Sequence, residues 1–321
     1  MKRWVNRAGL VAVLLTATAA YAQAWPTKTV KINVPYAAGG PADITAREIA
    51  LKLGAEIGQP VVVENNGGAM GVPSLTAVAR SDPDGHTLWM PALGNAVLQP
   101  LLSKQGGADL LSKLRPVGMV TTSPHVLVVS SKLPVKSVAE LVAYAKAHPG
   151  QVSFASAGVG GTAHLGAEMF KSLSGAETIH VPYKGSSAAV NDLVSGRVSA
   201  MFSSLPSLQA VVDKGYVRLL AATAPSKSPA TRSLPLMSAT LPGFEYSSWY
   251  AMYVPAATPD PVVMKINAAL QKVLKDPAVI EKIDPHGMET LPSTPDEVLQ
   301  YVKKDTEKWG QIIRKANISL E

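Results

Sequence analysis

Three glycine-rich turns contain the residues that could bind an anion. Each turn lies between a strand-like run and a helical pattern. The first turn follows the run 30–34 and precedes a helix that Pro41 is well suited to begin. Small residues leave backbone N–H groups accessible, and a helix N-terminus carries partial positive charge, so this turn suits an anionic ligand. Its candidate ligand-binding residues are Tyr36, Ala37, Ala38, Gly39, Gly40 and Asp43.

Two roles are open to Asp43. In the first helical turn its carboxylate can accept hydrogen bonds from free N–H groups and cap the helix, and Arg47 lies four residues on, close enough to pair with it. Alternatively, Asp43 contributes to ligand binding. The sequence leaves both roles open.

The second turn supplies Ala157, Gly158, Gly161, Thr162 and His164 as candidates. It contains a formal Gly-x-Gly-x-x-Ala pattern, which is typical of dinucleotide binding when an acidic residue ends the following strand. Here Glu177 precedes that strand instead. A glycine-lined carboxylate cradle, with the Thr162 hydroxyl as a donor, needs the same geometry and no cofactor. His164 is expected to form structural hydrogen bonds more often than to act in catalysis.

The third turn supplies Tyr183, Lys184 and Gly185. Lys184 could set a positive potential near a ligand, and Tyr183 could stack on it or donate its hydroxyl. The alternative is a solvated lysine beside a core tyrosine. Both interpretations stay open.

Several kinds of chemistry have no motif in this chain. Gly-x-Ser-x-Gly, His-Glu-x-x-His and P-loop patterns are absent, and the six histidines lack metal-ligand spacing. With no cysteine there is no thiolate nucleophile and no disulfide. The basic residues are dispersed, unlike those of a nucleic-acid surface. We therefore nominate no catalytic residue, no metal ligand, no cofactor and no nucleic-acid partner.

The beginning of the chain predicts export. Lys2, Arg3 and Arg7 flank a short apolar run that ends in small residues, which is typical of a secretory signal peptide over residues 1–24, cleaved after Ala24. A retained amphipathic anchor is the less favoured alternative. Cleavage would remove three of the charges behind the formal net charge of +7. Because a lipoprotein needs a cysteine at its cleavage point, we expect an unanchored periplasmic protein.

Short β-rich runs alternate with helical patterns over the rest of the 321 residues. This alternation predicts an α/β fold with mainly parallel sheets, and single cores rarely grow past ~250–300 residues, so two lobes are expected. A linker is expected between 90 and 126, and an irregular connection at 225–242. The expected strands are 30–34, 61–65, 86–90, 126–129, 152–155, 179–181, 200–202, 219–222 and 248–254. The expected helices are 46–57, 74–80, 138–147, 163–173, 187–194, 261–274 and 295–316.

A succession of short motifs resembles the Bug family, the periplasmic solute receptors of tripartite tricarboxylate transporters. The likeness covers essentially the whole chain after residue 24, in order. Its motifs are Trp25 to Lys28, Pro35 to Asp43, Ala46-Arg47, Val62 to Asn65, Pro83 to Leu88, Ala155 to Gly158, His164-Leu165, Val181 to Gly185, Leu241 to Glu245 and Ser248 to Tyr250.

The resemblance implies a two-lobe, type II periplasmic binding-protein fold with the ligand in the interlobe cleft. Residues 25–125 plus 247–321 would form lobe 1, and residues 126–246 would form lobe 2. The crossing segments would lie near His125 to Leu133 and Tyr246 to Val254. Backbone N–H groups and small polar side chains of the three turns would then hold the ligand.

The resemblance also implies a function without catalysis. The chain would capture a small carboxylated solute, either an aliphatic di- or tricarboxylate or an aromatic carboxylate, and hand it to membrane transporter subunits. We expect a monomer that closes around its ligand. The alternatives are a signalling receptor that docks to a sensor-kinase ectodomain and, less favoured, an enzyme on the same fold, such as a nicotinamide-dependent oxidoreductase.

Overall fold

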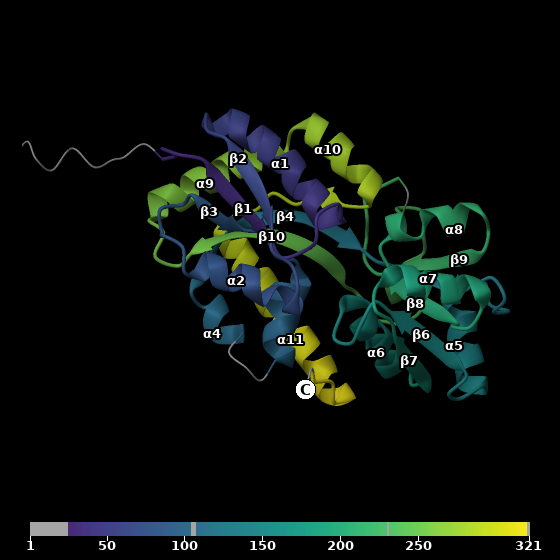
Figure 1. The fold of residues 1–321 in the computed structure, drawn as a ribbon. Coiled ribbons are helices and arrows are strands. Elements are labelled where there is room, and N and C mark those ends of the chain that lie inside the picture. Colours follow the sequence, from purple (N-terminus) through teal and green to yellow (C-terminus); the bar gives the residue numbers. More distant parts are fainter. Residues whose placement is uncertain (1–24, 104–106, 230, 320–321) are drawn as a thin grey trace, which may run out of the picture.

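The computed structural model describes residues 25–103, 107–229 and 231–319, which form two sheets, each with helices on both faces (Figure 1). The expected signal peptide and its cleavage site after Ala24 lie outside the described residues. Each sheet with its helices forms a separate body in the figure, and the two bodies lie side by side. The expected α/β, two-lobe organisation is therefore confirmed.

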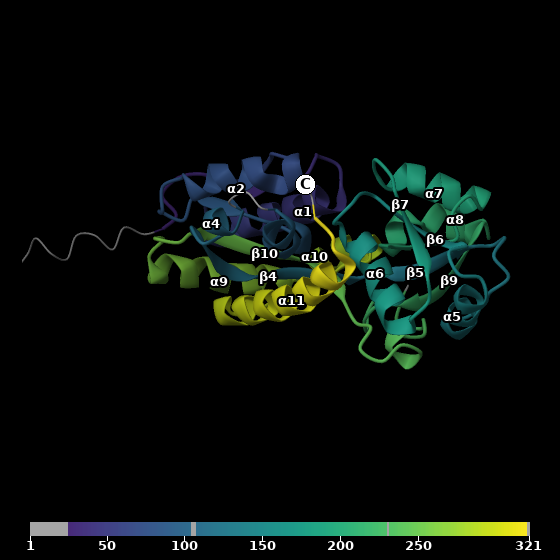
Figure 2. The same ribbon diagram turned by 90° about the horizontal axis from the view of Figure 1, so that it is seen from below.

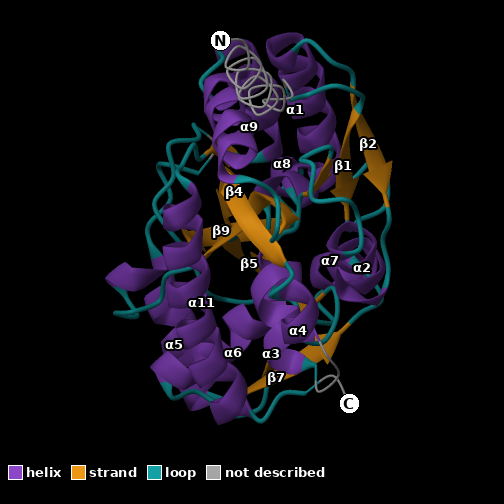
Figure 3. Cartoon of the chain, turned by 90° about the vertical axis from the view of Figure 1, so that its left-hand side faces the viewer, coloured by secondary structure: helices purple, strands orange, loops and turns teal. Residues whose placement is uncertain are grey.

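The first sheet has six strands in the order β11-β4-β10-β3-β1-β2. Helices α1, α9 and α10 cover one face, where α1 and α9 lie side by side (Figure 3), and α2 and α11 cover the other. The strands are β1 (Val30–Val34), β2 (Val61–Asn65), β3 (Thr87–Trp89), β4 (Leu114–Pro124), β10 (Ser247–Pro255) and β11 (Glu289–Thr290). The helices are α1 (Pro41–Ile57), α2 (Val72–Ala79), α9 (Asp260–Leu274), α10 (Pro277–Ile283) and α11 (Pro295–Ala316), with the shorter η2 (Gly94–Leu98), α3 (Gln99–Leu102) and α4 (Gly107–Leu111) beside α2 and α11.

The second sheet has five strands in the order β7-β6-β8-β5-β9. Helices α5 and α6 pack on one face, and α7 and α8 on the other. The strands are β5 (Val126–Ser130), β6 (Val152–Ser156), β7 (Thr178–Pro182), β8 (Ala200–Ser203) and β9 (Val217–Ala222). The helices are α5 (Val138–Ala147), α6 (Thr162–Ser174), α7 (Ser186–Ser195) and α8 (Gln209–Asp213).

Two expectations about these sheets are wrong. The sheets are mixed, because β4 pairs antiparallel with β10 and β5 pairs antiparallel with both β8 and β9. The predicted linker between 90 and 126 instead contains helical turns and the eleven-residue strand β4, which lies inside the first sheet. Proline and glycine residues interrupt the β pattern of this strand and concealed it, at Pro116, Gly118 and Pro124.

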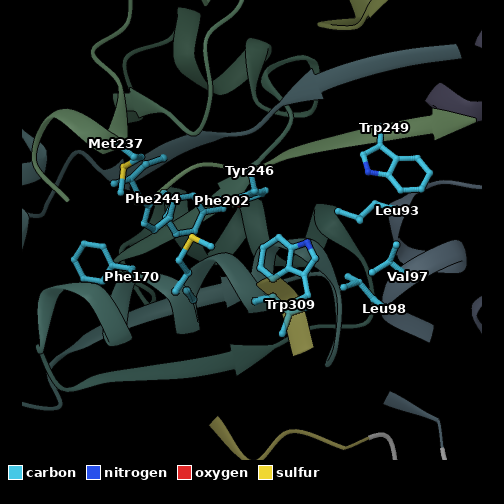
Figure 4. Close-up of a cluster of buried hydrophobic side chains, with 14 of the residues drawn as sticks. Leu93, Val97, Leu98, Phe170, Phe202, Met237, Phe244, Tyr246, Trp249 and Trp309 are labelled. Carbon is cyan, nitrogen blue, oxygen red and sulfur yellow. The ribbon is translucent and has the colours of Figure 1, made fainter. Parts of the chain in front are cut away.

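One hydrophobic core continues from the first sheet into the second. Trp249 and Trp309 come from β10 and α11, and they belong to the same buried cluster as Phe202 and Phe170 of β8 and α6 (Figure 4). Tyr246 lies between these groups, with its ring 5.4 Å from Trp309 and 6.1 Å from Phe202. Because this core is shared, the two sheets are packed together at one end and not merely tethered.

The chain crosses between the sheets twice, and Thr223 holds both crossings. The Thr223 hydroxyl donates to the Tyr246 carbonyl oxygen at 2.7 Å and accepts from the His125 N–H at 2.9 Å. Its backbone N–H donates to the carbonyl oxygen of His125, and its own carbonyl accepts from the N–H of Tyr246. One residue at the end of β9 therefore aligns the two crossing segments.

Close packing at Gly166 in α6 generates a first prediction. A Cβ at this position would lie 2.5 Å from the Tyr246 hydroxyl oxygen and 3.1 Å from Phe202. Although Gly→Ala inside a helix ordinarily stabilises by about 0.5–1 kcal/mol, Gly166→Ala should lower the free energy of unfolding because buried Tyr246 cannot move away. Thermal or urea denaturation measures the change.

Gly310→Ala is the matched control in α11. There the nearest atom to a new Cβ is a terminal nitrogen of the Arg314 side chain, at 3.2 Å, which can move. Gly310→Ala should leave stability unchanged or raise it. Equal stabilisation by both substitutions would contradict the tight packing of Tyr246 against α6.

Candidate functional site

The carboxyl ends of β6, β7 and β8 in the second sheet face the start of α1. Strands β6, β7 and β8 run parallel, so α6, α7 and Ser204 all follow strand ends on the same edge. Ser204 and Pro41, the first residue of α1, line one cavity of about 120 Å³. The turn before α1 and the turns before α6 and α7 therefore belong to facing edges of the two sheets.

Strands β4 and β10 of the first sheet form much of that cavity. His125, which follows β4, and Ser204, which follows β8, also line it. The sequence analysis did not identify these positions, because isolated serine and threonine residues in a strand resemble ordinary solvent-facing residues. Their proximity depends on the pairing of β4 with β10. The lining residues are Pro41, Thr121, Ser123, His125, Ser204, Ser248, Trp249, Tyr250 and Met288.

The helices that begin at the three predicted turns have no side-chain cap. Gly40, Gly161 and Gly185 occupy the N-cap positions of α1, α6 and α7, and none of these helices has a side-chain cap hydrogen bond. By contrast, Ser137 and Thr294 cap α5 and α11. First-turn N–H groups have no acceptor within a helix, so those of α1, α6 and α7 are available to an anion.

In the first turn, Asp43 stabilises its own loop. It is 3% exposed, and its Oδ2 accepts from the Gly39 N–H at 2.8 Å and from Arg47 Nε at 3.0 Å. Arg47 also donates to Asn65 Oδ1 at 3.1 Å. Hydrogen bonding to Arg47 is the largest cause of the lowered pKa of Asp43. Ala37, Ala38 and Gly39 of the same loop are exposed to solvent.

Tyr36 is held in place by both ends of its side chain. The hydroxyl donates to Asn95 Oδ1 at 2.7 Å, and the ring meets Tyr250 edge-on with centroids 6.5 Å apart. The Tyr36 carbonyl also accepts from Asn65 Nδ2 at 3.2 Å. Burial raises the pKa of Tyr36 strongly, so its hydroxyl stays protonated. Tyr36 therefore fixes the turn against the cavity residue Tyr250.

Two stacked imidazoles hold the second turn. The rings of His164 and His180 lie 3.6 Å apart with an interplanar angle of 13°. His164 Nδ1 accepts from the Gly160 N–H at 3.0 Å, while His180 Nε2 lies 2.7 Å from the Ser156 hydroxyl. That hydroxyl also lies 2.9 Å from the carbonyl oxygen of Gly158. Both histidines thus shape the turn that contains Ala157, Gly158, Gly161 and Thr162.

These two histidines are neutral near pH 7. Burial lowers the pKa of His164, and burial together with the neighbouring His164 lowers the pKa of His180 to about 4. Because Nδ1 of His164 accepts an N–H hydrogen bond, a neutral ring carries its proton on Nε2. That nitrogen lies 3.9 Å from Glu168 Oε1.

The third turn packs against the second. The Gly185 N–H donates to the Ala157 carbonyl at 3.3 Å, and the Tyr183 hydroxyl donates to Asp192 Oδ2 at 2.8 Å. Lys184 is exposed and does not line the cavity described above. Among the described residues, no hydrogen bond or ion pair links residues 36–43 to residues 157–164 or 183–185. The structure brings the second and third turns together and leaves the first across from them.

Within the part of the chain that the structure describes, no three His, Asp or Glu side chains come together as a group that could hold a metal ion. No helix there is long and apolar enough to cross a bilayer.

Comparison with known proteins identifies the family. The family model described as "Tripartite tricarboxylate transporter family receptor" matches residues 45–318. The chain belongs to this family. BugT of Bordetella pertussis is 33% identical to this receptor over 307 residues, covering 94% of this chain and 93% of BugT.

Solved structures agree with this assignment and with the expected periplasmic binding-protein fold. A Rhodopseudomonas palustris protein solved with adipate is 32% identical to this receptor, with a TM-score of 0.79, covering 92% of this chain and 99% of that chain. MatC from Rhodopseudomonas palustris, solved with bound malate, is 29% identical with a TM-score of 0.74, covering 90% of this chain and 100% of that chain. Members of the family are periplasmic solute-binding receptors.

The role of Asp43 in holding its loop can be tested at the backbone amide of Gly39. Asp43→Asn removes the charge that attracts Arg47 and weakens the acceptor of the Gly39 N–H. We expect faster hydrogen exchange at Gly39 with little change at the core strands, because charge-assisted hydrogen bonds are the stronger ones. NMR measures the rate of hydrogen exchange at each of these amides. Glu48→Gln on the same helix is the control, and unchanged exchange at Gly39 in Asp43→Asn would contradict the role.

The lowered pKa of His180 predicts a dependence of stability on pH. Between pH 6.5 and about 4, the unfolded chain binds a proton at this position that the folded chain does not. Stability should therefore fall as the pH falls through this interval. Replacing His180 with Gln, whose amide can still reach Ser156, should make the fall in Tm smaller. The same fall in both proteins would contradict the assignment.

Proposed function

We propose that this receptor binds a small carboxylated solute between its two sheets and delivers it to the membrane subunits of a tripartite tricarboxylate-type transporter. The observation that carries this proposal is the set of three uncapped helix N-termini on facing edges of the sheets. Two family structures were solved with adipate and malate, which supports a carboxylate as the ligand. The solute itself is an organic acid whose chain the cavity must accommodate.

The carboxylate lies among the backbone N–H groups of the three turns. Ala37, Ala38 and Gly40 act from lobe 1, and Ala157, Gly161 and Thr162 act from lobe 2. The N–H groups of Gly39, Gly158 and Gly185 are already bonded within the loops, so these glycines shape the turns. Tyr36, Asp43, His164 and Tyr183 act indirectly, because their polar groups hold neighbouring parts of the protein. Lys184 adds positive potential at the edge of the ligand site.

Closure of the two lobes on the solute reports its presence to the transporter. A ligand shifts this equilibrium only by as much as it prefers the closed form, so contacts from both lobes are required. In this proposal lobe 1 comprises residues 25–125 and 247–321, and lobe 2 comprises residues 126–246. The receptor acts as a monomer in the periplasm after cleavage following Ala24, without a cofactor and without catalysis.

Ligand binding should raise the melting temperature of the signal-free chain. Binding to the folded state stabilises in proportion to the logarithm of ligand concentration over Kd. We expect a concentration-dependent rise in Tm with at least one acid from a panel of aliphatic di- and tricarboxylates, aromatic carboxylates, amino acids and nicotinate. No shift with any of these acids would contradict the proposed function.

A matched pair of substitutions at Thr162 tests the backbone N–H directly. Thr162 is the first residue of α6, where proline fits the helix and removes only an N–H that has no helical acceptor. Thr162→Pro should leave Tm nearly unchanged and weaken binding of the preferred acid about tenfold, since hydrogen bonds to charged groups contribute about 1.5–3 kcal/mol. Calorimetric titration measures the affinity, and thermal denaturation measures Tm.

Thr162→Val is the control, because it removes the hydroxyl and keeps the N–H. It should weaken binding less than Thr162→Pro does. Equal affinities of the proline and valine variants would show that this N–H does not hold the carboxylate.

A further inference from the structure

A second hollow, a groove of about 450 Å³, lies between α6 and α11. These two helices belong to different lobes, and the end of α11 lies against α6 (Figure 2). None of the described residues lines both this groove and the cavity between the sheets. Small-molecule sites typically have volumes of about 300–1,000 Å³, so the groove is large enough to hold a solute of its own.

Glu168 of α6 presents a carboxylate to the groove that has little to balance it. Its side chain is 17% exposed, and Oε1 lies 3.9 Å from Nε2 of His164. It makes no hydrogen bond among the described residues. Burial raises the pKa of Glu168, and the nearby charge of Lys171 opposes that rise. A cation that reaches Glu168 from the groove would stabilise its charged form.

The ends of both helices add negative potential to the groove. Gly175, the C-cap of α6, and Ala316, the last residue of α11, are among its lining residues. The last carbonyl groups of a helix lack donors within that helix and carry partial negative charge, which favours a cation nearby. Together with Glu168, these ends favour an ammonium group in the groove.

Two lysines supply the opposite charge. Lys171 is exposed, and within the part of the chain that the structure describes no ion pair joins it to Glu168. Lys315 donates to the Ser172 hydroxyl at 2.8 Å. An ammonium group has three donors, so both lysines retain N–H groups for a carboxylate. Ile312 provides apolar surface in the same groove.

A solute that carries both charges would satisfy both sets of groups. We propose that this groove is a second ligand site, for a small zwitterion such as an amino acid. Its ammonium group pairs with Glu168, and its carboxylate pairs with Lys171 and Lys315. Because Glu168 and Lys315 belong to different lobes, the occupant binds one arrangement of the lobes better than others and so shifts their equilibrium.

NMR titration of the isotope-labelled, signal-free chain tests the site at the amides of Gly175, Ala176 and Lys315. The zwitterions leucine, 4-aminobutyrate and 6-aminohexanoate are each compared with an acid and an amine that carry one of the two charges. These pairs are 4-methylpentanoate with 3-methylbutylamine, butyrate with propylamine, and hexanoate with pentylamine. At least one zwitterion should bind about tenfold more tightly than its acid and its amine, because only it makes both charge-assisted contacts. No such preference in any series overturns the inference.

Substitutions in α6 separate the groove from the cavity between the sheets. Glu168→Gln removes the charge and keeps the shape, and Lys171→Met removes the charge of an exposed side chain. Each should weaken binding of the zwitterion at least fivefold. Thr162→Pro, at the start of the same helix and outside the groove, should leave it unchanged. Circular dichroism confirms that the variants fold. Weakening by Thr162→Pro as large as that by either groove variant overturns the inference.

The link to the lobes is tested by a distance between them. The chain has no cysteine, so Lys146→Cys on α5 and Lys275→Cys at the end of α9 allow one spin label on each lobe. Double electron–electron resonance measures the distribution of distances between the labels. Saturation with the zwitterion should shift or narrow this distribution, and Glu168→Gln in the labelled chain should abolish the effect. An unchanged distribution at saturation overturns the link between the groove and the lobes.

Discussion

The alignment of the two crossing segments by Thr223 is the constraint on which the rest of the molecule depends. Because Thr223 bonds to both His125 and Tyr246, the sheets meet at one fixed end, where Tyr246 and Trp309 extend a single core from one to the other. This geometry sets the carboxyl edge of the second sheet opposite the start of α1. Any opening or closing of the lobes must pivot at this end, since the shared core resists separation there.

Some of the described helices are capped by a side chain at their start, and others, including α2 and α9, are not. Side chains cap α5, α10 and α11, whereas α1, α6 and α7 begin at uncapped glycines. Loss of a cap costs about 0.5–2 kcal/mol, so capping at these three helices would favour stability. Glycine there keeps amides accessible to a ligand, and the surrounding polar side chains bind the loops instead. An uncapped start at a site is expected where function competes with stability.

Local sequence patterns predicted most helices and strands and the three turns. The periodicity of a strand or helix, and a glycine at a helix start, can be recognised within a short stretch of sequence. These local patterns missed β4, whose prolines and glycine interrupt its pattern, and α10, which is only seven residues long. The cavity lining was missed for a different reason. Ser123 and Ser248 become neighbours only through the antiparallel pairing of β4 with β10, a contact between residues 125 positions apart that local pattern cannot encode. Asp43 was placed correctly near Arg47, but its bond to Gly39 depends on the path of the loop.

The central claim is that backbone N–H groups at three uncapped helix starts hold the carboxylate. Amide proton chemical shifts of the signal-free chain, recorded by NMR with and without the acid that stabilises it most, test this claim most directly. The account predicts downfield shifts of first-turn amide protons in α1, α6 and α7 and unchanged shifts at the capped starts of α5, α10 and α11. Saturation with the acid and no downfield shift at those three uncapped starts would contradict it.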